Sequence, residues 1–531
     1  MHLPQELVDH ICSYLSPEDL KNAYYVSRIF RKAAEDHAGK YRTLEIEIAL
    51  ENKVHFVRNY SGFRLRYIKH IQFRPYFPDL LVDEESPCRE SAEEIYEKDA
   101  IFTKQIKGLF AILKKTENIA GIRNRGKYEL GIYHPKQAVV GDVCFHREHD
   151  LWRVHLLEHE TLPDLISVSS FRLRVDKWEK TRAKLDYRIV IDCITHFPNI
   201  EEVFWNTGYD EWNPNHDESP ADKVLWEYDG PRRDTRHGLS KAITSAQIPE
   251  SLHTLQFDLF YDDLDSGTHR AAEEIDQTKP MPNLVLPASK DPFSNSIRIL
   301  TCHLRTLTLR VQADEMTPSG AWYFEGPRGE GRFSIGYELG DEAYPPLEVT
   351  GEDEEQHWEF EEECTRAFET CYHFQFRVSP NDNVLEPFLE GFAKAAANMP
   401  KLMHAVLWSP LRWNVAGLRS KADRYGYEDF EYFNPRELCA EYGKEEDDLA
   451  WGLAYTKPRY HAAFRVNPGE INCEARQMWW AARNWRPNPS LHALIQKIGH
   501  REHGKALREY WDDGFGGRTS RWSFEHWSWS Y

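Results

Sequence analysis

The sequence predicts an α/β protein in which a small helical domain precedes a long, irregular repeat of helices and short strands. Two observations lead to this prediction. Signals for three short helices follow one another within the first 40 residues, and one apolar pattern that suits a strand recurs at five places between residues 68 and 407. Prolines stand just upstream of several copies, where they indicate a turn before the strand.

The composition is that of a folded, soluble chain. The 531 residues carry a net charge of -20, which argues against general affinity for nucleic acid or an anionic membrane. The nine cysteines include no C-x-x-C pair, so we expect reduced thiols and neither a disulfide framework nor a Cys-rich zinc site. No signal-peptide pattern and no apolar run of about 20 residues occurs, which predicts a cytoplasmic and/or nuclear protein without a membrane span.

The first 40 residues carry the clearest local signals. Along the first predicted helix, one apolar stripe is formed by Leu3, Leu7, Ile11, Tyr14 and Leu15. Ser16 and Pro17 predict a second helix from about residue 17, because a hydroxyl caps the first turn and proline fits the first helical position. Ser27 can cap a third helix. A unit this small cannot bury all of its apolar stripes alone.

The same residues resemble an F-box in order and in spacing. The matching positions are Leu3-Pro4-x-Glu6-Leu7, Ile11, Tyr14-Leu15, Pro17-x-Asp19-Leu20 and Val26-Ser27-Arg28-x-Phe30-Arg31. The resemblance implies a three-helix F-box domain over residues 1–40 that binds a Skp-family adaptor and, through it, a cullin. It also implies that residues 41–531 recognise a protein substrate for an SCF-type ubiquitin ligase.

The resemblance also assigns adaptor-binding residues. By motif position, the residues expected to contact the adaptor or to support that contact are Leu3, Pro4, Leu7, Ile11, Leu15, Leu20 and Val26. Some of them must face the core of the domain itself, and the sequence does not separate the two sets. The alternative is an ordinary amphipathic helical hairpin packed on its own core.

The recurring pattern is φ-x-x-φ-x-φ, where φ is apolar, and a strand places its last two apolar residues on one face. Its copies are Ile68/Ile71/Phe73, Ile200/Val203/Trp205, Leu252/Leu255/Phe257, Leu304/Leu307/Leu309 and Leu402/Ala405/Leu407. Pro198, Pro249 and Pro400 introduce three of them, and segments that can be helical precede two. This order of helix, proline turn and short strand is typical of a leucine-rich-repeat-like solenoid.

The repeat is irregular. Three copies start 52 residues apart, whereas a regular leucine-rich repeat has about 20 to 29 residues, so each step holds two units or one unit with a long insertion. The combination resembles filamentous-fungal F-box proteins, which share blocks similar to RYIKHIQF, FPNIEEVFW and MPKLMHAVLW. The alternative is a single α/β domain whose strands share only generic hydrophobicity.

Several segments interrupt or end the repeat. Residues 79–100, 206–234 and 313–363 are rich in Pro, Gly and acidic residues and are predicted to be surface loops. We expect the acidic run 351–363 to be a solvated surface. The alternative is that it binds a basic partner protein. The Trp-rich segment 479–531 is expected to cap the solenoid, with an aromatic peptide-binding groove as the alternative.

One segment offers an enzyme hypothesis. His155-Leu156-Leu157-Glu158-His159 matches the inverted zinc-protease pattern H-x-x-E-H. On a helix the two histidines would share one metal, Glu158 would act as general base, and His146 or His149 could add a ligand. The alternative is a set of partly exposed histidines on a charged loop or helix.

The sequence therefore predicts a non-catalytic subunit with no cofactor, whose partners are the Skp-family adaptor, a cullin and a protein substrate. The nucleophile elbow G-x-S-x-G, the loop G-x-x-x-x-G-K-[ST] and the fingerprint G-x-G-x-x-G do not occur. A zinc-dependent hydrolase using His155, Glu158 and His159 is the alternative from another class. A third hypothesis is an F-box scaffold that acts outside any ligase.

Overall fold

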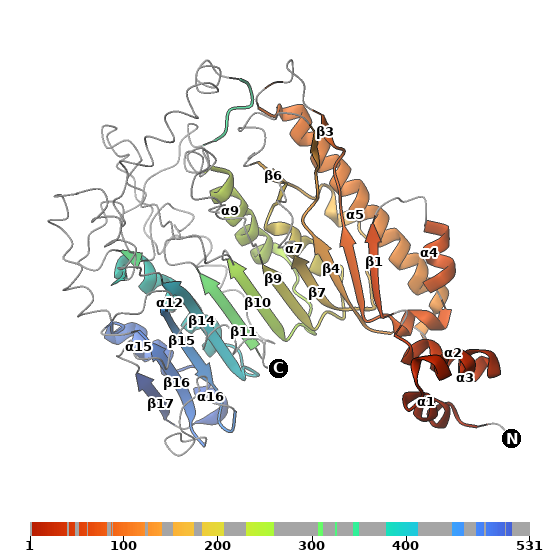
Figure 1. The fold of residues 1–531 in the computed structure, drawn as a ribbon. Helices are drawn as coiled ribbons and strands as arrows, with labels where there is room; N and C mark the ends of the chain where they lie inside the picture. Colours follow the sequence, from red (N-terminus) through yellow and green to blue (C-terminus); the bar gives the residue numbers. More distant parts are fainter. Residues whose placement is uncertain are drawn as a thin grey trace, which may run out of the picture.

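The computed structural model comprises a helical N-terminal domain and a large α/β domain (Figure 1). It describes residues 3–39, 42–47, 53–60, 62–81, 87, 89–122, 126–140, 152–174, 183–206, 230–259, 306–311, 324–325, 344–349, 379–411, 449–460, 474–482, 485–504 and 506–511.

Three helices form the N-terminal domain: α1 (Gln5–Ser13), α2 (Pro17–Val26) and α3 (Arg28–His37). Both predicted caps are confirmed, because the Ser16 hydroxyl accepts a hydrogen bond from the Asp19 amide and the Ser27 hydroxyl accepts one from the Phe30 amide, each at 3.2 Å. Helix α3 packs against both other helices. The small core consists of Val8, Cys12, Leu20, Ala23, Ala33 and Ala34.

One sheet of eleven strands runs through the described part of the α/β domain. In spatial order its strands are β1 (Thr43–Glu47), β2 (His70–Arg74), β4 (Tyr128–Tyr133), β7 (Val168–Arg174), β9 (Glu202–Asn206), β10 (Thr254–Leu259), β11 (Thr306–Val311), β14 (His404–Leu411), β15 (Leu449–Thr456), β16 (Arg476–Ala481) and β17 (Leu507–Trp511). Neighbours in space are therefore also neighbours in chain order. Pairing is parallel from β1 to β14.

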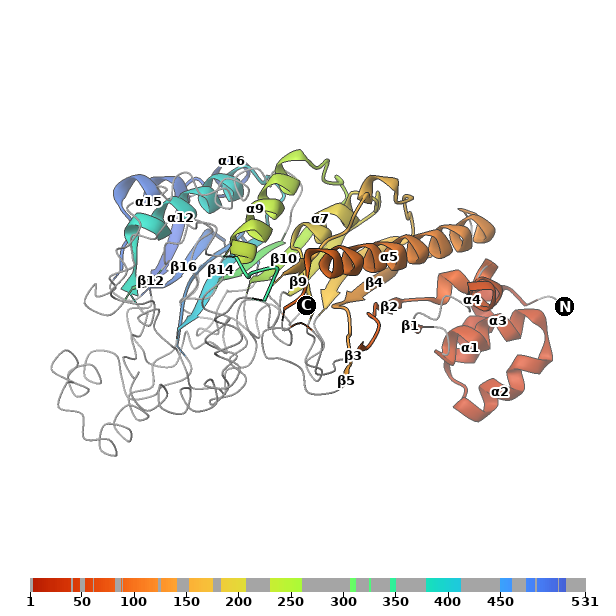
Figure 2. The ribbon, with the colours of Figure 1, turned by 90° about the horizontal axis from the view of Figure 1, so that it is seen from above.

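Helices cover one face of this sheet, as Figure 2 shows for α5, α7, α9, α12 and α15. The helices of this domain are α4 (Lys53–Tyr60), η2 (Gly62–Tyr67), α5 (Ala92–Ala120), η4 (His159–Thr161), α7 (Arg188–Ile194), α9 (Gly230–Ser245), α12 (Asp382–Ala397), α15 (Pro489–Ile495) and α16 (His500–His503). Short strands outside the sheet pair as β3 (Leu80–Leu81) with β5 (Val139–Val140), β6 (Arg153–Val154) with β8 (Lys184–Leu185), and β12 (Phe324–Glu325) with β13 (Ser379–Pro380). Among the described residues, one apolar cluster joins the sheet to the helices.

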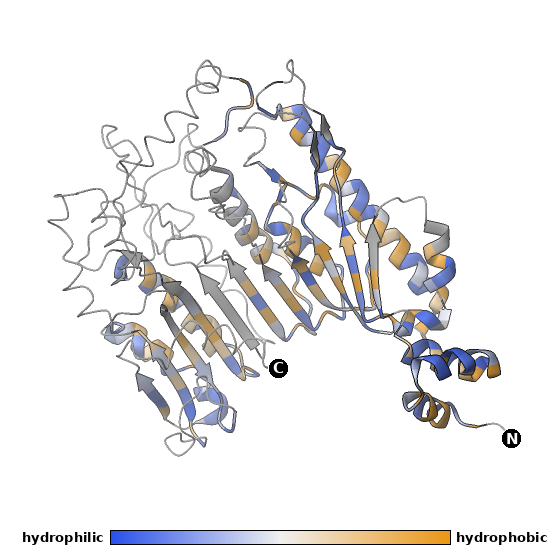
Figure 3. Cartoon of the chain, in the orientation of Figure 1, coloured by the Kyte–Doolittle hydropathy of each residue, from blue (hydrophilic) through white to orange (hydrophobic). Residues whose placement is uncertain are grey.

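In all five copies of the apolar pattern, the last two apolar positions lie on strands of this sheet. The parallel register places Val203 beside Leu255, Leu255 beside Leu307, and Leu307 beside Ala405, so equivalent positions of four copies form one row. Strands such as β2, β7 and β10 alternate between hydrophobic and hydrophilic residues, as the colours of Figure 3 show. The predicted α/β content is confirmed, whereas the assignment to leucine-rich repeats stays a prediction.

The order helix, proline, strand is also present in the structure. Helix α7 leads through Pro198 to β9, and α12 leads through Pro400 to β14. The direction of the chain changes at β15, which is antiparallel to both of its neighbours, β14 and β16. A repeat of one parallel unit therefore does not extend to the end of the sheet.

Two segments that are predicted to be loops overlap helices in the structure. The loop predicted over residues 79–100 is wrong from residue 92 onward, where α5 begins, because Ser91 and Glu94 form a reciprocal capping box. The loop predicted over 206–234 overlaps the first residues of α9. The acidic run 351–363 lies outside the described residues, as does most of 313–363.

The Trp-rich C-terminal segment extends the sheet. Strand β17 is its edge strand, and the rings of Trp480 and Trp511 stack with centroids 4.4 Å apart. Residues 512–531 are outside the described part, so the predicted cap stays a prediction. In the ranges that the structure describes, no helix combines the length and the apolar character that a membrane crossing requires.

Candidate adaptor-binding surface

Helix α1 carries apolar side chains on two faces. Val8 and Cys12 point into the core of the N-terminal domain and are almost completely buried. Leu7 and Ile11 lie one turn apart on another face and are 50% and 42% exposed, and Leu3, which precedes the helix, is 42% exposed. Of the stripe predicted from the sequence, Leu3, Leu7, Ile11 and Tyr14 therefore face solvent, whereas Leu15 packs against the core.

Large exposed side chains continue beyond this row. Tyr14 is 76% exposed at the end of α1, and Tyr25 is 81% exposed beside the exposed Val26 at the end of α2. The Tyr14 ring packs edge-to-face against His10 at 5.0 Å between ring centroids. Grouped apolar side chains that stay in water are typical of a surface that binds another protein.

The seven residues predicted for adaptor binding fall into two groups. Those exposed to solvent are Leu3, Pro4, Leu7, Ile11 and Val26. Leu20 is only 7% exposed and belongs to the core, and the half-buried Leu15 packs against it. The first group is available to a partner, while the second can only support it.

Two exposed aromatic residues are missing from the predicted set, Tyr14 and Tyr25. For Tyr14 the signal was present in the sequence, because it lies three residues after Ile11 and shares a helix face with it. For Tyr25 no local signal exists, since only the packing of α2 on α3 determines which side of α2 faces solvent.

The histidine motif does not lie on a helix. Residues 155–158 form an irregular turn, Glu158 has a left-handed backbone with φ of 50°, and a short 3-10 helix starts at His159. The two imidazoles are therefore not presented as i and i+4 on one helix face. The helical zinc arrangement predicted from H-x-x-E-H is wrong.

Each ring nitrogen of His155 lies close to a carboxylate group. Its Nδ1 lies 3.4 Å from Asp99 Oδ2, and its Nε2 lies 3.2 Å from Asp186 Oδ2. Burial alone would lower the pKa of His155, but hydrogen bonds to Asp186 and Asp99 and their charges raise that pKa to about 10. The imidazole is thus favoured as a cation between two carboxylates, and a metal would have to displace a proton from it to bind.

The other two motif residues have separate partners. Glu158 accepts a hydrogen bond from Lys107 Nζ at 2.6 Å, which lowers the pKa of its carboxyl group. His159 Nε2 lies 3.3 Å from Asp192 Oδ1 and 3.0 Å from a guanidinium nitrogen of Arg188. Among the described residues, no group of three or more His, Cys, Asp or Glu side chains is arranged to hold a metal ion. His146 and His149 lie outside those residues.

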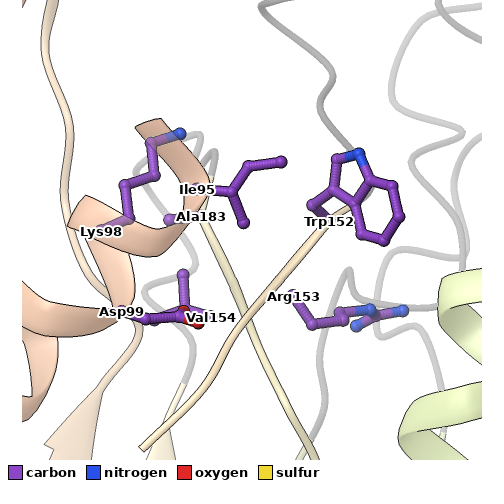
Figure 4. A pocket seen from close by; sticks show the side chains of 7 residues that line it. All are labelled: Ile95, Lys98, Asp99, Trp152, Arg153, Val154 and Ala183. Atoms are coloured by element: carbon purple, nitrogen blue, oxygen red, sulfur yellow. The ribbon is translucent and has the colours of Figure 1, made fainter. Parts of the chain in front are cut away.

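A small hollow lies next to the histidine motif (Figure 4). Residues of α5 lie on one side of it and residues around β6 on the other; the lining consists of Ile95, Lys98, Asp99, Trp152, Arg153, Val154 and Ala183. It has room for about one water molecule. A hollow of this size does not accommodate a peptide or another hydrolase substrate.

Comparison with known proteins identifies the N-terminal domain. A family model described as F-box-like matches residues 1–45, which comprise the three helices and the beginning of β1. No curated protein matches the chain. The match covers the residues from which the sequence resemblance was drawn. The chain therefore carries an F-box-like domain at residues 1–45.

Proposed function

We propose that this protein is a substrate-recognition subunit of an SCF-type ubiquitin ligase. The F-box-like domain binds a Skp-family adaptor and, through it, a cullin, and the α/β domain binds a protein substrate. The single observation that carries the proposal is the exposed apolar row of Leu3, just before α1, and Leu7 and Ile11 of α1, within a domain that matches the F-box-like family. F-box domains generally bind adaptors of this kind.

The proposed role requires no catalytic residue in this chain. The subunit would hold a substrate lysine close to the conjugating enzyme, and proximity alone raises the effective concentration of the reacting groups. The chemistry of ubiquitin transfer would belong to other subunits. A role in the cytoplasm and/or the nucleus follows from this proposal.

Co-purification tests the adaptor contact. The full chain and the Leu7→Asp/Ile11→Asp variant are each co-expressed with the Skp-family adaptor and the cullin, purified by affinity, and identified by mass. We expect the full chain to retain both partners and the variant to lose both, because two carboxylates would be desolvated in an apolar interface. Adaptor retained by the variant would contradict the proposal.

Ser13→Asp is the matched control. Ser13 is exposed on α1 and lies on a different face of the helix from Leu7 and Ile11. This variant adds a charge to the same helix and is expected to retain the adaptor. An adaptor complex that never contains the cullin would favour the scaffold hypothesis over the ligase hypothesis.

A further inference from the structure

The face of the sheet opposite the helices carries three arginines on the two strands that flank β4, Arg74 of β2 and Arg172 and Arg174 of β7. Ile71 and Phe73 of β2 point into the core beneath the helices. Residues alternate along a strand, so Gln72 and Arg74 point to the opposite face. The parallel register places Gln72 beside Gly131 of β4, and Gly131 beside Arg172 of β7.

One carboxylate holds two of these arginines in place. Glu129 Oε2 accepts a hydrogen bond from Arg172 Nε at 2.6 Å, and its Oε1 accepts one from Arg174 at 2.7 Å. Glu129 is largely buried, whereas the side chains of Arg172 and Arg174 are 27% and 33% exposed. Both guanidinium groups are thus positioned before any partner binds, yet remain in contact with solvent.

Aromatic rings fix the arginines further. The Arg172 guanidinium lies 4.0 Å from the ring centroid of Phe204, and the Arg74 guanidinium lies 4.0 Å from that of Tyr133. We call this surface, made of Arg74, Glu129, Tyr133, Arg172, Arg174 and Phe204, the arginine face.

The arginine face is positively charged in a strongly acidic chain. Around Glu129 it holds the two guanidinium groups of Arg172 and Arg174 against one carboxylate, whereas the strand register sets Glu47 of β1 beside Arg74. The whole chain carries a net charge of -20. Arg172 uses only its Nε for Glu129, and its terminal nitrogens donate no hydrogen bond to another described residue. A guanidinium has five N–H donors in a planar fork that matches a carboxylate, so donors remain for an external anion.

We propose that the arginine face binds an acidic peptide segment of a partner protein through its Asp and Glu carboxylates. The fixed guanidinium groups would donate hydrogen bonds to external carboxylates, as Arg172 and Arg174 already donate to Glu129. Under the proposed function, on which the identity of the partner rests, this segment belongs to the substrate. Charge complementarity selects it, because the rest of this chain repels an acidic peptide.

Fluorescence anisotropy of short labelled peptides tests the proposal with the full chain. A glutamate-rich peptide is compared with its glutamine counterpart and with a counterpart that carries one phosphoserine among neutral residues. We expect the glutamate-rich peptide to bind and the glutamine peptide not to bind. Arg172→Gln/Arg174→Gln should weaken binding by about tenfold or more, because charge-assisted hydrogen bonds are lost. Binding of the phosphoserine peptide alone would overturn the proposal.

The Glu129→Gln variant separates a loss of peptide binding from a loss of folding. It removes the internal competitor of the external carboxylates and keeps all three arginines, so the glutamate-rich peptide should bind more tightly than to the unaltered chain. Weaker binding by a folded Glu129→Gln variant would overturn the proposal. Arg459→Gln is the control for charge, because Arg459 is exposed beyond β15 and pairs with Glu474; it should bind the peptide as the unaltered chain does.

The peptide assay is independent of the adaptor. A chain that binds the adaptor but not the acidic peptide would refute the arginine face and leave the proposed function intact. A chain that binds the peptide but not the adaptor would refute the proposed function and leave peptide binding by the arginine face intact.

Discussion

Arg64 joins the F-box-like domain to the α/β domain through a bidentate ion pair with Glu35. The Arg64 guanidinium donates hydrogen bonds of 3.0 Å and 2.7 Å to the two carboxylate oxygens of Glu35, which is buried at the end of α3. Arg64 itself lies in η2, next to α5. The contact fixes the helical domain against the domain proposed to bind the substrate.

Arg64→Gln should loosen this junction. The substitution leaves the Glu35 carboxylate buried without its ion-pair partner, which should destabilise the packing of α3 by about 3 kcal/mol. Hydrogen exchange of the α3 amides measures the effect and should become faster, while exchange in the central strands stays unchanged. Arg31→Gln is the control, because Arg31 is exposed on the same helix; equal acceleration by both variants would contradict the role of the ion pair.

Leu20 and Tyr25 should respond differently to truncation, although they lie on the same helix. Leu20→Ala removes a buried side chain from a small core and should destabilise the domain by about 3 kcal/mol. Tyr25→Ala changes an exposed side chain and should alter stability by no more than about 0.5 kcal/mol, yet weaken adaptor binding. Hydrogen exchange and adaptor affinity, measured for both variants, distinguish a residue that stabilises the domain from one that contacts the adaptor. Unchanged adaptor affinity for Tyr25→Ala would exclude Tyr25 from the interface.

Local chemistry explains which parts of this fold could be predicted. The caps at Ser16 and Ser27 and the strand pattern around Trp205 depend only on neighbouring residues, and the structure contains each of them. The capping box of Ser91 and Glu94 was equally local but was obscured by the acidic composition around it. These elements follow from short stretches of sequence.

Packing and register explain which parts could not be predicted. Leu7 and Leu20 look alike in the sequence, and only the position of α3 determines that one faces solvent and the other the core. The arginine face combines Glu129 with Arg172 and Arg174, residues more than 40 positions apart in the chain. Strand register brings them together, and no motif encodes that register.

His155 should make stability depend on pH above neutrality. Its folded-state pKa, about 10, is higher than the ordinary value of 6.5, so the folded chain holds a proton that the unfolded chain loses first. The contribution is fully present below pH 6.5 and is lost as the pH rises through about 10. Denaturant unfolding at a series of pH values should show this decline, and His155→Gln should reduce it. An equal decline in the variant would contradict the prediction.

Gly126 should tolerate alanine less well than Gly121. Both glycines have positive φ, 62° at Gly126 and 66° at Gly121, so alanine is strained at either position. At Gly121, where ψ is 176°, the backbone conformation is essentially confined to glycine and should cost alanine about 1 to 3 kcal/mol. At Gly126 a Cβ would also lie 2.6 Å from the Cα of Arg66, whereas at Gly121 nothing lies within 4 Å.

The clash at Gly126 is with backbone, which cannot move aside as a side chain can. The segment before β4 and the end of η2 would have to separate, and overpacking of this kind typically costs a further 1 to 3 kcal/mol, as an approximate range. Thermal unfolding should therefore rank Gly126→Ala below Gly121→Ala, and both below the unaltered chain. If the two variants unfolded at the same temperature, the close approach of residues 66 and 126 would not contribute to stability.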